Sequence, residues 1–215
     1  METWAIHFLR RHGRLVLRAA LAAAVVPLVF ALGACSHVRS ADTEPLDRSG
    51  MDYDSVKQLK ALNITQPEVA EILKMHGAGV SDQDCIRLIR IVHARNQIFS
   101  AGDTVADMIQ AGMSEETILA LANLDQLGSS AGELEAMHLA GLSDAIVLEV
   151  ARHRAQGKPV LSGASLAGLK NTGLRSSTLL ELVRRGVPDS QANAIIYYRR
   201  HGASDAQILH RFTRS

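Results

Sequence analysis

The sequence predicts an all-α fold, an array of about ten short antiparallel helices joined by tight turns. Three observations lead to this prediction. Apolar residues recur with a period of 3.6 from Ser55 to the end of the chain, and a Gly-x-Ser motif recurs between these amphipathic runs. Aromatic residues make up only 4% of the chain, while Ala, Leu, Ile and Val are plentiful, which suits a core of small helices.

The clearest copy of the turn motif is Gly141-Leu142-Ser143, followed by Asp144. A Gly after the last helical residue can adopt the left-handed conformation that ends a helix, and a Ser two residues later can cap the next helix. An acid behind the cap meets the positive end of the helix dipole. We predict the same turn and cap roles at three further copies: Gly79 and Ser81, Gly112 and Ser114, and Gly202 and Ser204.

Weaker copies of the turn begin at Leu62, Gly173 and Gly186, the last two with Arg175 and Pro188 at the cap position. Successive joints are separated by 16, 33, 29, 32, 13 and 16 residues. The larger spacings are near twice the smaller ones, so we expect further joints that lack the signature in the middle of the array. Helices are expected near residues 55–62, 66–76, 82–95, 104–111, 115–126, 131–139, 144–156, 164–171, 177–185, 189–200 and 205–212.

The N-terminal segment has the pattern of a secretory signal. Residues 1–18 carry arginines, and residues 19–34 are uncharged and mostly apolar. This apolar stretch is shorter than the ~20 residues that a membrane-spanning helix needs. An uncleaved signal anchor is the alternative, and Arg10-Arg11 invites a twin-arginine interpretation that His12 does not fit well.

The signal ends in Leu32-Gly33-Ala34-Cys35, which resembles the lipobox of bacterial lipoproteins. The resemblance implies that residues 1–34 are removed and that Cys35 becomes an acylated N-terminus attached to a membrane. Ser36, in place of the Asp associated with inner-membrane retention, implies an outer-membrane protein facing the periplasm. Residues 35–54 are polar and are expected to form a flexible tether, and residues 55–215 form the repeat domain.

The repeat domain resembles the helix–Gly-x-Ser/Asp–helix repeats of uncharacterised exported bacterial proteins, over residues 57–212. Such repeats imply a helical fold and no particular reaction. A pair of short helices cannot bury its apolar face alone, so neighbouring pairs must stack.

Charge is distributed unevenly along the chain. Residues 35–150 hold 8 basic and 18 acidic side chains, a net charge of −10, whereas residues 151–215 hold 11 basic and 3 acidic ones, a net charge of +8. We therefore predict an acidic first half and a basic patch that binds an anionic envelope component or protein partner, or supports self-association. A solvated basic face is the alternative. The candidate anion-binding residues are Arg184, Arg185, Arg199, Arg200, Arg211 and Arg214.

No catalytic or metal-binding motif stands out, so we predict no enzymatic activity, no cofactor and no metal. Cys85 lies within an apolar helical face and is predicted to be buried. The predicted function is a lipid-anchored binding or structural module. One alternative is a nucleic-acid binder, because residues 169–174 resemble the first half of a helix-hairpin-helix motif, although Arg175 replaces its second Gly. The other alternative is an envelope enzyme.

Overall fold

The computed structural model describes residues 41–213, which contain twelve α-helices, one 3-10 turn and no strand. The predicted all-α fold is confirmed for these residues. The α-helices are α2 (Glu44–Arg48), α3 (Tyr53–Ala61), α4 (Gln66–Gly77), α5 (Asp82–His93), α6 (Gly102–Gln110), α7 (Glu115–Asn123), α8 (Ala131–Leu139), α9 (Asp144–Ala155), α10 (Gly163–Asn171), α11 (Ser176–Arg184), α12 (Ala192–Arg200) and α13 (Asp205–Phe212), and the 3-10 turn is η1 (Asp189–Gln191).

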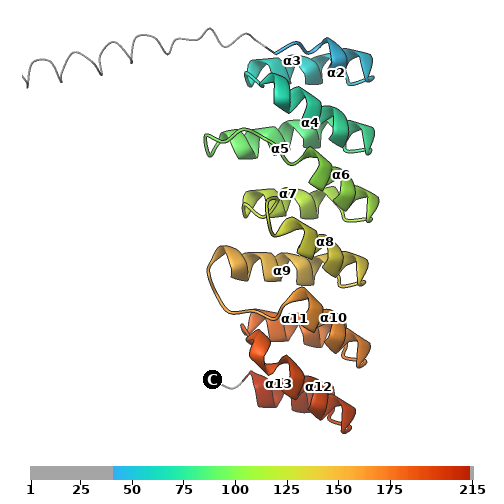
Figure 1. Cartoon of the computed structure of the whole chain (residues 1–215), viewed down its shortest axis with the longest axis vertical. Helices are drawn as coiled ribbons and strands as arrows, with labels where there is room; N and C mark the ends of the chain where they lie inside the picture. Colours follow the sequence, from blue (N-terminus) through green and yellow to red (C-terminus); the bar gives the residue numbers. More distant parts are fainter. Residues whose placement is uncertain (1–40, 214–215) are drawn as a thin grey trace, which may run out of the picture. The chain divides into compact units, whose positions relative to one another are not determined.

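The helices form six antiparallel pairs, from α2–α3 to α12–α13, stacked one on the next (Figure 1). Even-numbered helices pack on the neighbouring even-numbered helices, and odd-numbered helices do the same, which produces two rows. We call the side with the turns inside each pair the joint edge (residues 49–52, 78–81, 111–114, 140–143, 172–175 and 201–204). The opposite side, with the connections between pairs, is the loop edge (residues 62–65, 94–101, 124–130, 156–162 and 185–191).

The folded array begins earlier than predicted, inside the segment that was expected to be a flexible tether. Residues 44–48 form α2, and Leu46 and Met51 are buried. A helix of five residues is too short to display a 3.6 period, and Pro45 suggested a loop. Proline is tolerated in the first turn of a helix, where its missing N–H needs no partner. The signal segment and Cys35 lie outside the described residues.

The predicted glycines Gly79, Gly112, Gly141, Gly173 and Gly202 adopt the left-handed conformation at the joint edge, with φ between 74° at Gly141 and 94° at Gly79. The predicted Gly186 is also left-handed, with φ of 65°, but lies at the loop edge. Gly50 does so as well, with φ of 88°, and forms the joint between α2 and α3. Within pairs, joints therefore recur every 29, 33, 29, 32 and 29 residues. Between pairs, the left-handed residues are Asn63 and Gly186 of the weaker predicted copies, and Asn96, Asp125 and Gly157, which account for the expected joints in the middle of the array.

Three of the four predicted serine caps are made. Ser81, Ser114 and Ser204 each accept a hydrogen bond from the backbone N–H three residues later. Ser143 has the same extended backbone but makes no side-chain cap, so the prediction for this residue is wrong. At this joint the backbone N–H of Ile146, the donor that would reach the Ser143 hydroxyl, donates to the Ser143 carbonyl oxygen at 2.8 Å.

The two ends of the array carry polar residues where the inner repeats carry apolar ones. Arg211 of α13 holds the position of four residues that are at most 1% exposed in the inner repeats: Leu88, Leu121, Val150 and Leu182. At the other end, Lys57 and Lys60 of α3 hold the positions of the buried Ile86 and Ile89. Polar residues at these positions are typical of the terminal pairs of a repeat array.

Candidate anion-binding site

The predicted basic patch is divided between the two edges of the array. Arg184 and Arg185 end α11 at the loop edge, while Arg199 and Arg200 end α12 at the joint edge. Consecutive helices run in opposite directions, so their C-terminal arginines point to opposite sides. Arg211 of α13 is separate from both pairs of arginines. Its guanidinium stacks on the ring of Tyr198, with its Cζ 4.1 Å from the ring centre. The predicted single patch is therefore wrong, and Arg214 lies outside the described residues.

At the joint edge, Arg199 is occupied within the fold. Its guanidinium donates to the carbonyl oxygens of Thr172 at 3.3 Å, Gly173 at 2.9 Å and Ala203 at 2.9 Å. Lys170 of α10 has the same role in the preceding repeat, because its Nζ donates to the carbonyl oxygens of Ala140 at 2.9 Å and Gly141 at 2.6 Å. These cations complete the C-terminal ends of the preceding even-numbered helices.

Acidic side chains connect successive repeats along the same edge. Each is the first residue of an odd-numbered helix and accepts a hydrogen bond from the capping turn of the preceding odd-numbered helix. The four pairs are Asp82 with the Asp52 amide (2.7 Å), Glu115 with the Ser81 hydroxyl (3.0 Å), Asp144 with the Ser114 hydroxyl (3.0 Å) and Asp205 with the Arg175 amide (3.1 Å). We call this row the cap ladder. The acids that were predicted to stabilise helix N-termini therefore also connect neighbouring repeats.

The electrostatics of the cap ladder follow from these contacts. Partial burial acts to raise the pKa of Asp205, but the Thr178 hydroxyl, the Arg175 amide and the nearby guanidinium of Arg199 outweigh it and hold the pKa below its usual range. The pKa of Asp144 is likewise lowered, because hydrogen bonds from Thr117 and Ser114 exceed the effect of burial. Several acids of the first half are thus bonded within the fold, which reduces the acidic surface expected from composition.

A buried carboxylate that the sequence did not reveal lies near the loop edge. The Glu68 side chain of α4 is 0% exposed and accepts four hydrogen bonds. Two come from the amide and hydroxyl of Thr65, at 2.8 and 2.9 Å, one from the Phe99 amide at 2.9 Å and one from His93 Nε2 at 2.7 Å. Burial alone would raise the pKa of Glu68, but these bonds lower it. The carboxylate holds the 94–101 loop on the array.

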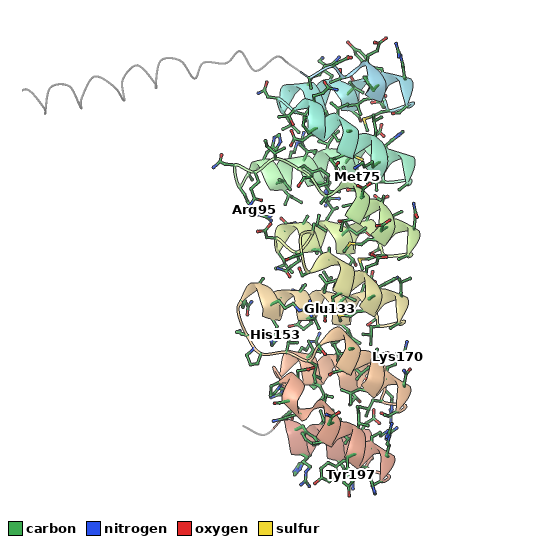
Figure 2. All side chains as sticks on the ribbon, viewed as in Figure 1. Met75, Arg95, Glu133, His153, Lys170 and Tyr197 are labelled. Atoms are coloured by element: carbon green, nitrogen blue, oxygen red, sulfur yellow. The ribbon has the colours of Figure 1, made fainter. Side chains whose placement is uncertain are left out.

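Of the predicted arginines, Arg184 and Arg185 line a hollow of about 430 Å³ at the loop edge, whereas Arg200 does not contribute to it. It lies between the C-terminal ends of α9 and α11, beside the 156–162 loop, and we define it by Arg152, His153, Lys158, Arg184 and Arg185 as the basic hollow. Figure 2 shows His153 on this side of the array, opposite Lys170. Arg152 and Arg184 are 32 residues apart, as are the N-cap positions of their helices, Ser143 and Arg175, so the repeat period could have revealed this pairing.

The cations of the basic hollow differ in how they are bonded. Arg152 is 2.9 Å from Glu149, and Arg185 is 2.7 Å from Glu181. Among residues 41–213, no ion pair involves Lys158 or Arg184, and both residues are exposed. His153 is nearly buried, with its Nδ1 3.3 Å from the Pro159 carbonyl oxygen.

A second, larger hollow of about 700 Å³ lies on the terminal pair, between α12 and α13. Tyr198, His201, Gln207 and Arg211 contribute to its lining. In the inner repeats the corresponding face is covered by the next pair, whereas no helix pair follows α13 among residues 41–213.

The described residues offer little for covalent or metal chemistry. Cys85 is fully buried, as predicted, and burial together with the charges of Asp82 and Glu115 raises its thiol pKa to about 12. Within residues 41–213, no three His, Cys, Asp or Glu side chains gather into a possible metal site. None of the helices described for this chain is both long and apolar enough to span a membrane.

The segment that resembles a helix-hairpin-helix motif lies at a joint. Gly173 is left-handed with φ of 83°, as a turn requires. The amide of Arg175, which stands where that motif offers a backbone N–H to phosphate, donates to Asp205. Comparisons with protein-family models, curated proteins and solved structures found no match to this chain.

Proposed function

We propose that this chain is a lipid-anchored envelope protein whose helical array acts by binding rather than by catalysis. The observation that carries the proposal is Leu32-Gly33-Ala34-Cys35 at the end of a charged and then apolar N-terminal segment. In the lipoproteins that it resembles, this pattern directs acylation of the cysteine. Ser36 favours the outer membrane, with the array facing the periplasm.

The architecture of the array supports a binding role. Stacked helix pairs present a long surface whose residues can vary without disturbing the core, and repeat proteins use such surfaces for recognition. The joint edge directs its polar groups to the array itself, while the loop edge presents a hollow lined by cations. This distribution favours a binding module with its recognition surface at the loop edge.

The anchor can be tested by intact mass spectrometry of the chain isolated from the membranes of a diderm bacterial host. We expect a mass that corresponds to a chain starting at acylated Cys35, and sedimentation with the membranes. Cys35→Ser should abolish the lipid and leave an unprocessed chain, whereas Cys85→Ser, the matched control, should leave processing unchanged. Recovery of an unmodified mature chain that begins at another residue would contradict the proposal.

A further inference from the structure

We infer that the basic hollow is a binding site for a phosphate monoester, a ligand class that deepens the proposed binding role. The hollow gathers three arginines and a lysine from α9, α11 and the 156–162 loop, although Arg152 and Arg184 are 32 residues apart in the chain. Side chains from separate elements thus converge on one concave surface, which is the arrangement that binds a small anion.

The charge of the hollow selects the kind of anion. Arg152, Lys158, Arg184 and Arg185 contribute four positive charges, and Glu149 and Glu181 contribute two negative ones, so two positive charges are in excess. A phosphate monoester carries a charge of about −1.5 to −2 at neutral pH, whereas a carboxylate carries only one. The excess therefore matches a phosphate monoester better than a single carboxylate.

The bonding within the hollow leaves donors available to such a ligand. Glu149 and Glu181 each hold one arginine in place, while Lys158 and Arg184 have no ion-pair partner among the described residues. An arginine fork can donate two parallel hydrogen bonds to phosphate oxygens, and a lysine supplies a point charge. At about 430 Å³, the hollow has room for a phosphorylated headgroup or a small sugar phosphate.

The alternative is that these cations only stabilise the negative ends of two helix dipoles, because the hollow lies at the C-termini of α9 and α11. That role needs no ligand and predicts no preference between anions. The two interpretations therefore differ in binding, which can be measured directly on the full chain in neutral detergent. The measurement does not require an acylated Cys35, so its failure is distinguishable from failure of the proposed anchor.

The experiment is isothermal titration calorimetry with glycerol 3-phosphate and with inorganic phosphate, and with acetate as the single-charge comparison. We expect both phosphates to bind and acetate to bind at least about tenfold more weakly. Lys158→Gln combined with Arg184→Gln should weaken phosphate binding about tenfold or more. The matched control, Lys57→Gln with Lys60→Gln, removes the same charge from the first repeat and should change the affinity less than about twofold.

Thermal unfolding followed by circular dichroism shows that each variant is folded before it is titrated. Arg184→Lys provides a milder change that keeps the charge.

To identify the source of the phosphate, the titration is repeated in micelles containing phosphatidic acid or phosphatidylcholine. If the apparent affinity for the titrated phosphate falls in micelles with phosphatidic acid but not in micelles with phosphatidylcholine, a lipid headgroup competes for the hollow and is supported as the ligand. If the affinity is the same in both, a soluble phosphate is supported. Absent phosphate binding, equal binding of acetate, or equal binding by the hollow variant and the parent would overturn the inference.

Discussion

The joint edge and the loop edge use polar side chains in different ways. At the joint edge the same contacts recur from repeat to repeat, with left-handed glycines, capping residues and the cap ladder of acids. At the loop edge the connections vary from four to eight residues in length, and their contacts differ, such as the Glu68 network in one place and the basic hollow in another. The regular edge holds the repeats in register, and the irregular edge carries the features that distinguish this protein.

The largest expected effect of a single change is at Glu68, where the loop edge depends on one buried carboxylate. Glu68→Gln replaces an acceptor of four hydrogen bonds with a group that must place an NH2 against other donors. Leaving buried partners of a charge unsatisfied should lower the free energy of unfolding by about 3 kcal/mol. Urea denaturation followed by circular dichroism measures this loss. Glu135→Gln, on a partly exposed site in α8, should change stability by less than about 0.5 kcal/mol.

The next effect tests the cap ladder through its pH dependence. The pKa of Asp205 is lowered in the folded chain, so its contribution is present above the unfolded pKa of about 4 and is lost as the pH falls through the folded value. We expect Asp205→Asn to cost about 1–2 kcal/mol at pH 7 and less at pH 3. Asp107→Asn, at an exposed site, is the control. A cost that stays constant between these pH values would show that the Asp205 charge contributes nothing to the ladder.

A similar cost is expected at the glycine turns. Gly141→Val places a β-branched side chain at φ of 74° and should destabilise the fold by about 1–2 kcal/mol. A Cβ at Gly141 would also displace Lys170, whereas a Cβ at Gly79 would meet nothing within 4 Å. Gly79→Val therefore isolates the backbone strain. If Gly141→Val proves no more costly than Gly79→Val, the Lys170 contacts with the joint contribute nothing measurable.

The smallest effect separates two joints that look alike in sequence. Ser114→Ala should cost about 1 kcal/mol, because it removes the acceptor for the Thr117 amide. Ser143→Ala should cost less than about 0.3 kcal/mol, because Ser143 makes no cap hydrogen bond. Thermal unfolding of both variants in parallel would reveal the difference. Equal losses would mean that Ser143 caps its helix in solution.

The sequence predicted the helices and the joint edge well because both depend on local patterns. A Gly followed two residues later by Ser specifies a turn and a cap without reference to the rest of the chain. The same local logic failed at Ser143, where the Ile146 amide donates to the backbone carbonyl of Ser143 and not to its hydroxyl, and at α2, which is too short to show a period.

The candidate site was predicted only incompletely because it depends on which edge each helix end reaches. Arg184 and Arg199 look equivalent in sequence, since both lie near the end of a basic helix, yet one reaches the loop edge and the other caps the joint edge. Arg152 and Lys158 lie beside Arg184 because neighbouring repeats pack together, although they are distant from Arg184 in the sequence. Thr65 and Glu68 form a capping box that the sequence pattern could have revealed, but the contacts with His93 and Phe99 come from residues 25 and 31 positions later in the chain.

The different roles of the two edges can be tested directly by amide chemical-shift mapping of the full chain in neutral detergent during a titration with inorganic phosphate. We predict that shifts concentrate around Arg152, Lys158 and Arg184–Gly186, and that the joint glycines from Gly79 to Gly202 stay unchanged. Shifts that concentrate at the joints, or that spread evenly over basic residues on both edges, would contradict the claim that the loop edge carries the binding site and the joint edge is structural.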